Sequence, residues 1–191
     1  FPNKCPSCGS KTVKEFNLTT KKMDAVTRCP DPNFDCETIL KEKLKHFVSK
    51  DALNIEGLGK KVIENFWNMK LIKYPSDIFN LDYKKINSLE GWGDLSTSNL
   101  KKAINDSKKI SLSKFIFSIG IRHIGQENAK ILSKYFISIA GFKNLFNSSE
   151  RKKDLENLKS INGIGASQIH SIEVFFSNEK NLDVIKSLIK N

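Results

Sequence analysis

The chain has 191 residues, which is enough for one large domain or for two or three small ones. Hydrophobic residues make up 39% and charged residues 28%, so a disordered chain is excluded. The 32 Lys and Arg residues outnumber the 21 Asp and Glu residues, and the net charge of +11 favours a polyanionic partner such as nucleic acid or an anionic membrane surface. Most of the basic residues are Lys, however, and the A/T-rich codons of Lys, Asn and Ile are an alternative source of this surplus.

No apolar run approaches the roughly 18–20 residues of a membrane span, and no signal peptide is visible, so we expect no membrane partner. The chain opens on Phe1 and Pro2 rather than on Met. This opening suggests a piece of a longer protein.

All four cysteines lie in the first 36 residues, as a C-x2-C pair, a gap of twenty residues and a C-x6-C pair. Two close pairs joined by a loop suit tetrahedral zinc, because each pair offers two thiolates and the loop closes the tetrahedron. Two disulfides or four free thiols are the alternatives, and the missing export signal argues against disulfides. Four thiolates leave no open position, so the predicted Zn²⁺ is structural and holds a segment too short to build its own core. The predicted ligands are Cys5, Cys8, Cys29 and Cys36.

Beyond Cys36 the apolar residues recur at helical spacing, beginning with Ile39, Leu40 and Leu44. No strand-like alternation follows, so residues 38–191 are predicted to be all-α. We also expect the phenylalanines of the second half to lie in the core, Trp92 to be buried between helices, and His46 and His170 to be ordinary surface or core residues.

Four five-residue segments repeat one pattern, in which an apolar residue begins a short turn, an apolar residue and Gly end it, and an amphipathic helix follows. We call them turn 1 (residues 55–59, IEGLG), turn 2 (89–93, LEGWG), turn 3 (121–125, IRHIG) and turn 4 (161–165, INGIG). Their last glycines are 32 to 40 residues apart. Four such turns in register predict tandem helix-hairpin-helix motifs, whereas one alone would be an ordinary helix cap.

Such a turn can hold a phosphate, because its glycines allow positive φ and leave the backbone uncovered. The unsatisfied N–H groups at the start of the second helix, together with the helix dipole, form an anion site that does not read sequence. Asp94 should weaken turn 2, and Ser167 and Gln168 are possible donors at turn 4. The predicted DNA-binding residues are Gly57, Gly59, Lys60, Lys61, Gly91, Gly93, Arg122, His123, Gly125, Gly163 and Gly165.

The predicted fold is therefore mainly α, with a small four-cysteine zinc finger at residues 1–37 followed by a tandem helix-hairpin-helix domain. Residues 38–112 would hold motifs 1 and 2, and residues 113–191 would hold motifs 3 and 4. No catalytic residue is predicted in the chain.

This order of parts resembles the C-terminal part of bacterial NAD-dependent DNA ligases. The resemblance rests on CPSCG at residues 5–9, HFVSK at 46–50, NIEGLGKK at 54–61, LEGWG at 89–93 and GIRHIG at 120–125. It covers nearly the whole chain.

The resemblance implies a DNA-gripping region whose missing N-terminal domains seal nicks in double-stranded DNA, with NAD and Mg²⁺ bound outside this chain. It implies contacts with an OB-fold and an adenylation domain, a monomer, and a bacterial cytoplasmic, nucleoid-associated location. Because no K-x-D-G adenylation motif occurs, this piece alone should be inactive as an enzyme.

Two alternatives remain open from the residues. A base-excision glycosylase would use Lys61 as a Schiff-base lysine, with Asp77 or Asp82 downstream. A non-catalytic tandem hairpin module of another DNA repair or recombination protein would need none of these groups.

Overall fold

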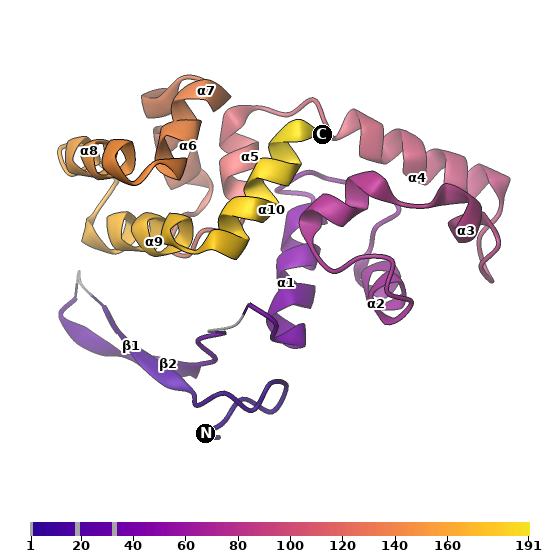
Figure 1. The fold of residues 1–191 in the computed structure, drawn as a ribbon, viewed down its shortest axis with the longest axis horizontal. Coiled ribbons are helices and arrows are strands. Elements are labelled where there is room, and N and C mark those ends of the chain that lie inside the picture. Colours follow the sequence, from indigo (N-terminus) through magenta and orange to yellow (C-terminus); the bar gives the residue numbers. More distant parts are fainter. Residues whose placement is uncertain (1, 18–19, 32–33) are drawn as a thin grey trace.

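A computed structural model describes residues 2–17, 20–31 and 34–191 (Figure 1). Within these residues a two-stranded β-hairpin precedes a helical body and lies at one side of it. The strands are β1 (Val13–Asn17) and β2 (Lys22–Arg28). The helices are α1 (Glu37–Val48), α2 (Lys60–Asn68), η1 (Pro75–Asn80), α3 (Tyr83–Asn87), α4 (Asp94–Asp106), α5 (Leu112–Ser118), α6 (Gln126–Phe136), α7 (Ile139–Phe142), η2 (Lys143–Phe146), α8 (Ser148–Leu158), α9 (Ala166–Ser177) and α10 (Glu179–Lys190).

The β-hairpin forms most of the twenty-residue gap between the two cysteine pairs, and we call the described part of residues 1–37 the cysteine module. Its strands are antiparallel, with Lys14 opposite Thr27 and Phe16 opposite Met23. The register shifts between Lys14 and Phe16, which is the mark of a β-bulge. The mainly helical prediction is confirmed, and the two strands of this module are an addition that the sequence does not predict.

One continuous hydrophobic cluster runs from α1 to α10 and includes buried residues of all four helix pairs. Helix α10 packs on η1, and α1 packs on α5, so the predicted halves 38–112 and 113–191 share one core. The phenylalanines of the second half pack in or against this cluster, and Phe142 and Phe176 are fully buried. No helix in the described ranges is long and apolar enough to span a bilayer.

Each of the four turns joins two helices and has the same backbone geometry. The third residue of each turn has positive φ: +88° at Gly57, +80° at Gly91, +59° at His123 and +91° at Gly163. In every turn the N–H of the fourth residue donates to the carbonyl of the first, at 3.0–3.2 Å. The glycine that ends each turn is the extended N-cap of α2, α4, α6 or α9. The four motifs are therefore in the register that the sequence predicts.

The fourth residue of each turn packs toward the core. Leu58, Ile124 and Ile164 are buried, as a residue wedged between two helices should be. Trp92 is only half-buried and lies against Phe66, with ring centroids 5.5 Å apart. The expectation that Trp92 is buried is therefore wrong, and the indole is larger than the Leu or Ile side chain that fills this position in the other turns.

Helices α1 and α2 are joined by an ion-pair network around Glu64. Its two carboxylate oxygens accept from Lys41 at 3.0 Å and from Lys45 at 2.7 Å. These contacts from Lys45 and Lys41 hold the pKa of Glu64 below its usual range. Helices α1 and α2 lie on either side of turn 1 in the chain, and the network holds them together.

Replacing Gly91 by Ala should destabilise the protein by about 1–2 kcal/mol, because a side chain at that φ is strained even though the new Cβ meets no atom within 4 Å. Gly93→Ala is the matched control, since its backbone is extended and its Cβ also meets nothing. It should cost about 0.5 kcal/mol as a changed N-cap. Chemical denaturation measures both values, and equal costs would contradict the assigned register.

Replacing Glu64 by Gln should lower the melting temperature at neutral pH. A carboxyl whose pKa is lower when folded stabilises the protein above its unfolded pKa of about 4.3, and that stability is lost as the pH falls through the folded pKa. The difference between wild type and variant should therefore shrink below about pH 4. Thermal unfolding followed by circular dichroism between pH 7 and pH 3 checks this, with Glu156→Gln, which loses an exposed pair with Lys159, as the control. A difference that is constant with pH would rule the network out.

Candidate functional site

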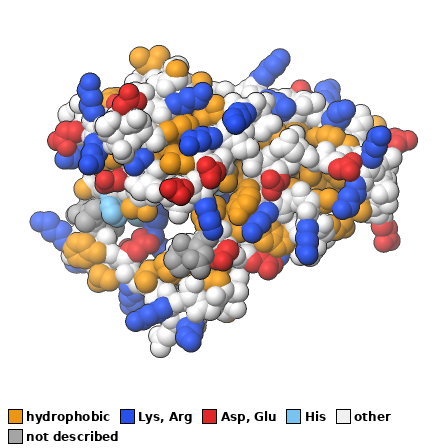
Figure 2. Space-filling view, in the orientation of Figure 1, with side chains coloured by type: hydrophobic (Ala, Val, Ile, Leu, Met, Phe, Trp, Pro, Cys, Tyr) orange, Lys and Arg blue, Asp and Glu red, His pale blue; other side chains and the backbone are white. Residues whose placement is uncertain are grey.

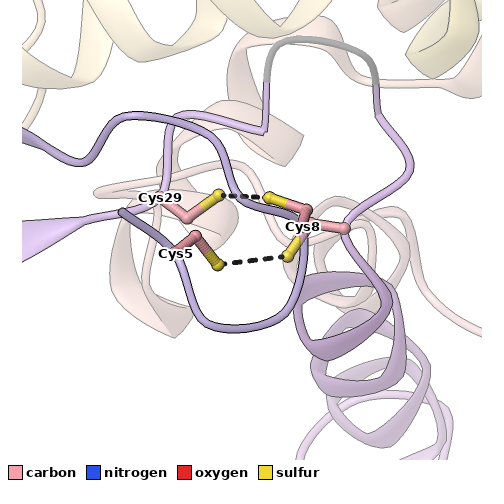
Figure 3. Close-up of side chains that lie close together, drawn as sticks. Cys5, Cys8 and Cys29 are labelled. Atoms are coloured by element: carbon pink, nitrogen blue, oxygen red, sulfur yellow. Dashed lines mark hydrogen bonds between the residues drawn. The ribbon is translucent and has the colours of Figure 1, made fainter. Parts of the chain in front are cut away.

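The four predicted cysteine ligands meet at one point. Their sulfur atoms all lie within 4.8 Å of one another, with 3.9 Å between Cys5 and Cys36 and 3.4 Å between Cys8 and Cys29. Figure 3 shows the thiols of Cys5, Cys8 and Cys29 turned toward the same centre. A tetrahedral zinc with bonds of about 2.3 Å needs sulfurs about 3.8 Å apart, so this set fits the ion. All four are free thiols, and these separations exceed a disulfide bond of about 2.05 Å.

The local backbone explains how the cysteines converge. The turn from Cys5 is closed by hydrogen bonds from the Gly9 N–H to the Cys5 carbonyl and from the Cys5 N–H to the Ser10 carbonyl, both at 2.8 Å. Gly9 has a φ of +74°, which suits glycine. Cys29 directly follows β2, and Cys36 is the N-cap of α1. The cluster thus joins both ends of the β-hairpin to the helical body.

The thiols differ in acidity. Hydrogen bonds with the Ser10 side chain and backbone lower the pKa of Cys8 to about 7. Burial raises the pKa of Cys29 to about 12, and burial also raises the pKa of Cys36. Thiolates at these two positions need a nearby cation, so the donor set can bind a metal such as zinc. In the described ranges it is the only group of three or more His, Cys, Asp or Glu residues with this geometry.

Turn 1 presents the most basic of the four helix N-termini. Lys60 and Lys61 are exposed in the first turn of α2, which contains no acidic residue. The Gly59 N–H has no acceptor among the described residues, because the third helical residue here is Val62. The backbone and the two lysines therefore favour an anion at the same place.

The other three turns satisfy that N–H from within the chain. A polar side chain at the third helical position accepts from the N-cap glycine at 2.9 Å in turn 2, 3.3 Å in turn 3 and 3.1 Å in turn 4. The acceptors are Ser96, Asn128 and Gln168. At turn 4 the predicted donor Gln168 thus uses its oxygen on Gly165, while Ser167 is buried.

Turns 2 and 3 also differ from turn 1 in charge, because each has an acidic side chain in the first turn of its second helix. Asp94 begins α4, where it accepts from the Asn87 amide at 2.9 Å. Glu127 lies in the first turn of α6 and pairs with Lys130. Glu127 is a functional residue that the sequence predictions omit, although its place two residues after Gly125 marks it as an acid at a helix start.

Arg122 and His123 of turn 3 have partners within the chain. The Arg122 guanidinium pairs with Glu15 of β1 and with Asp24 of β2, the latter at 3.2 Å. The Nδ1 atom of His123 lies 2.9 Å from the Ser171 hydroxyl of α9. Their predicted contacts with DNA stay predictions, and the intramolecular partners were not foreseen.

The remaining candidates are accounted for by packing and capping. Nε2 of His46 lies 2.8 Å from the Phe117 carbonyl, and His170 is exposed. Asp77 accepts from the backbone N–H groups of Lys73 and Tyr74, and Asp82 from those of Lys84 and Lys85. Both carboxylates of the glycosylase alternative therefore cap helices. On the face drawn in Figure 2, basic and acidic side chains are interspersed rather than gathered into one basic patch.

Comparisons with known proteins agree with this geometry. Residues 114–185, which include turns 3 and 4, match the family described as "Helix-hairpin-helix motif". The chain is 55% identical over 191 residues to a protein named DNA ligase from Pelagibacter ubique (strain HTCC1062), with 100% of the chain covered. It is 43% identical over 198 residues to the DNA ligase of Ehrlichia canis (strain Jake), with 100% covered, and 39% identical over 196 residues to that of Parvibaculum lavamentivorans, with 98% covered.

In each case the chain spans 28% of the relative's length. The resemblance to DNA ligase is thus confirmed over the whole chain, which corresponds to a segment of the proteins that carry that name.

Proposed function

We propose that this chain is the DNA-binding C-terminal region of an NAD-dependent DNA ligase. It would grip nicked double-stranded DNA through backbone phosphates while domains outside the chain seal the nick. The observation that carries the proposal is the common register of the four turns, each with a left-handed third residue and an N-cap glycine at the start of a helix. The relatives named DNA ligase support the enzyme class.

The first contact would be a phosphate at turn 1. The N–H of Gly59 and the first N–H groups of α2 point out of the helix start, and Lys60 and Lys61 add two positive charges. Because only the backbone of DNA is touched, binding would not depend on base sequence. The N-termini at Gly93, Gly125 and Gly165 would add weaker contacts, since their cap N–H groups are already bonded and two of them carry an acid in the first turn.

The second part of the proposal is a structural Zn²⁺ held by Cys5, Cys8, Cys29 and Cys36. The bound ion would supply the positive charge that four thiolates need and would fix the β-hairpin relative to α1. Because α1 is the first helix of motif 1, the metal would also order the region next to turn 1.

In this proposal the chemical steps of ligation take place in domains outside this chain. NAD and Mg²⁺ would bind there, because this chain has no K-x-D-G motif. The same proposal gives the chain contacts with an OB-fold and an adenylation domain, a monomeric state, and a bacterial cytoplasmic, nucleoid-associated location. The chain alone would bind DNA without sealing it.

Replacing both Lys60 and Lys61 by Ala should weaken binding to nicked and intact duplexes of any sequence. Each lost phosphate contact should reduce the slope of log affinity against log salt by about 0.9. Fluorescence anisotropy with a labelled duplex between low and moderate salt measures both effects. Lys186→Ala, which changes an exposed lysine on α10 outside the four turns, is the control and should change the slope little. An unchanged slope in the double variant would refute turn 1 as a phosphate site.

Removing the metal should unfold the cysteine module and leave the helical body folded. We expect one zinc per chain by elemental analysis, and loss of dispersed amide signals for residues of β1 and β2 after chelation or in Cys36→Ala. The amides of α6 and α9 in the same NMR sample serve as the internal control, because the core they share does not depend on the cysteines. A module that stays ordered without metal would contradict the zinc assignment.

A further inference from the structure

We propose that Arg122 is a positioning residue that docks the β-hairpin of the cysteine module on turn 3. Its guanidinium reaches both strands at once, pairing with Glu15 of β1 and Asp24 of β2. Arg28 pairs with the same Asp24 carboxylate from within the β-hairpin, at 3.2 Å. Glu15 and Asp24 both belong to the β-hairpin, and Arg122 is the cation from turn 3 that pairs with them.

The described apolar side chains of the strands are largely exposed, so their burial does not hold the β-hairpin in place. Phe16 and Met23, which face each other across the strands, are 54% and 56% exposed, and Val26 is 48% exposed. The cysteine cluster fixes only the base of the β-hairpin, because Cys5, Cys8 and Cys29 all lie outside the strands. A polar contact along the strands is therefore what sets their direction relative to the helices.

The irregular register of the β-hairpin places the two acids together. Between the pairs Lys14–Thr27 and Phe16–Met23, β1 has one residue, Glu15, while β2 has three, including Asp24. Two carboxylates on neighbouring strands repel each other unless a cation lies between them. A guanidinium suits this task, because its planar fork can donate to two carboxylates in fixed directions.

His123 supports Arg122 from behind. The Arg122 Nε–H donates to Nε2 of His123 at 3.3 Å, so Nδ1 carries the ring hydrogen and donates to the Ser171 hydroxyl of α9 at 2.9 Å. The other three turns have Gly where turn 3 has His123, and His123 takes the same left-handed backbone at φ +59°. The backbone of His123 is therefore strained where a Gly would not be. Its side chain orients the Arg122 guanidinium toward the β-hairpin.

A comparison of the four turns indicates that the position of Arg122 is not a phosphate-binding position. The second residue of the other turns is Glu56, Glu90 or Asn162, and all three are exposed. Glu56 and Glu90 would repel a phosphate, so a phosphate contact is not a shared role of this position in the four turns. The Arg122 side chain is therefore available to bind the cysteine module.

The test is the motion of the β-hairpin in the metal-loaded chain without DNA, measured by ¹⁵N NMR relaxation. We expect β1 and β2 amides in the wild type to have order parameters near the 0.85 of a rigid backbone, and to fall below about 0.6 in Arg122→Glu. Lys130→Glu makes the same charge change at an exposed site of α6 and should leave them unchanged. Adding Glu15→Lys and Asp24→Asn to Arg122→Glu should restore rigidity, because the introduced carboxylate on turn 3 then faces the introduced ammonium on β1 and the free Arg28.

A rigid β-hairpin in Arg122→Glu, or failure of the added substitutions to restore rigidity, would overturn the proposal. If Arg122→Glu disturbs the helical amides, the pair Glu15→Gln and Asp24→Asn on the exposed β-hairpin gives the same test without altering turn 3. Loosening then supports the docking role, and an unchanged β-hairpin refutes it. Because no DNA is present, these results are independent of the proposed function.

Discussion

The arrangement of the helical body depends on one backbone constraint, a left-handed residue two positions before a helix N-cap. It reverses the chain within five residues, turns the apolar fourth residue inward, and leaves the first N–H groups of the next helix facing outward. Used four times, it builds the helix pairs around a single shared core. The same geometry that permits burial of Leu58, Ile124 and Ile164 also creates the candidate anion sites.

The sequence was informative where structure is local. Glycine at Gly57, Gly91 and Gly163 and the spacing of the cysteines encode tight turns, so the hairpin register and the sulfur cluster were predictable. The sequence did not predict contacts between residues that are far apart along the chain. The pairing of Arg122 with Asp24 joins residues 98 positions apart, and nothing in either segment marks the other. The half-exposure of Trp92 likewise depends on its tertiary surroundings, including Phe66 of α2, which spacing alone does not reveal.

The four motifs share a backbone but differ in charge. The first combines two lysines with a cap N–H that has no acceptor in the described part of the chain, whereas the second and third carry Asp94 and Glu127 at the helix start. The net charge of +11 is therefore a poor guide to the binding surface, since basic and acidic groups alternate over the face in Figure 2. What distinguishes turn 1 is the placement of a few charges on a backbone already suited to phosphate.

The most direct test of this account is an NMR titration of the metal-loaded chain with a short nicked duplex. We predict that the amide signals that shift most are those of Gly59, Lys60, Lys61 and Val62, followed by those at the starts of α4, α6 and α9. Shifts confined to other surfaces, such as α10 or the exposed strands of the β-hairpin, or no shifts at low salt, would contradict it.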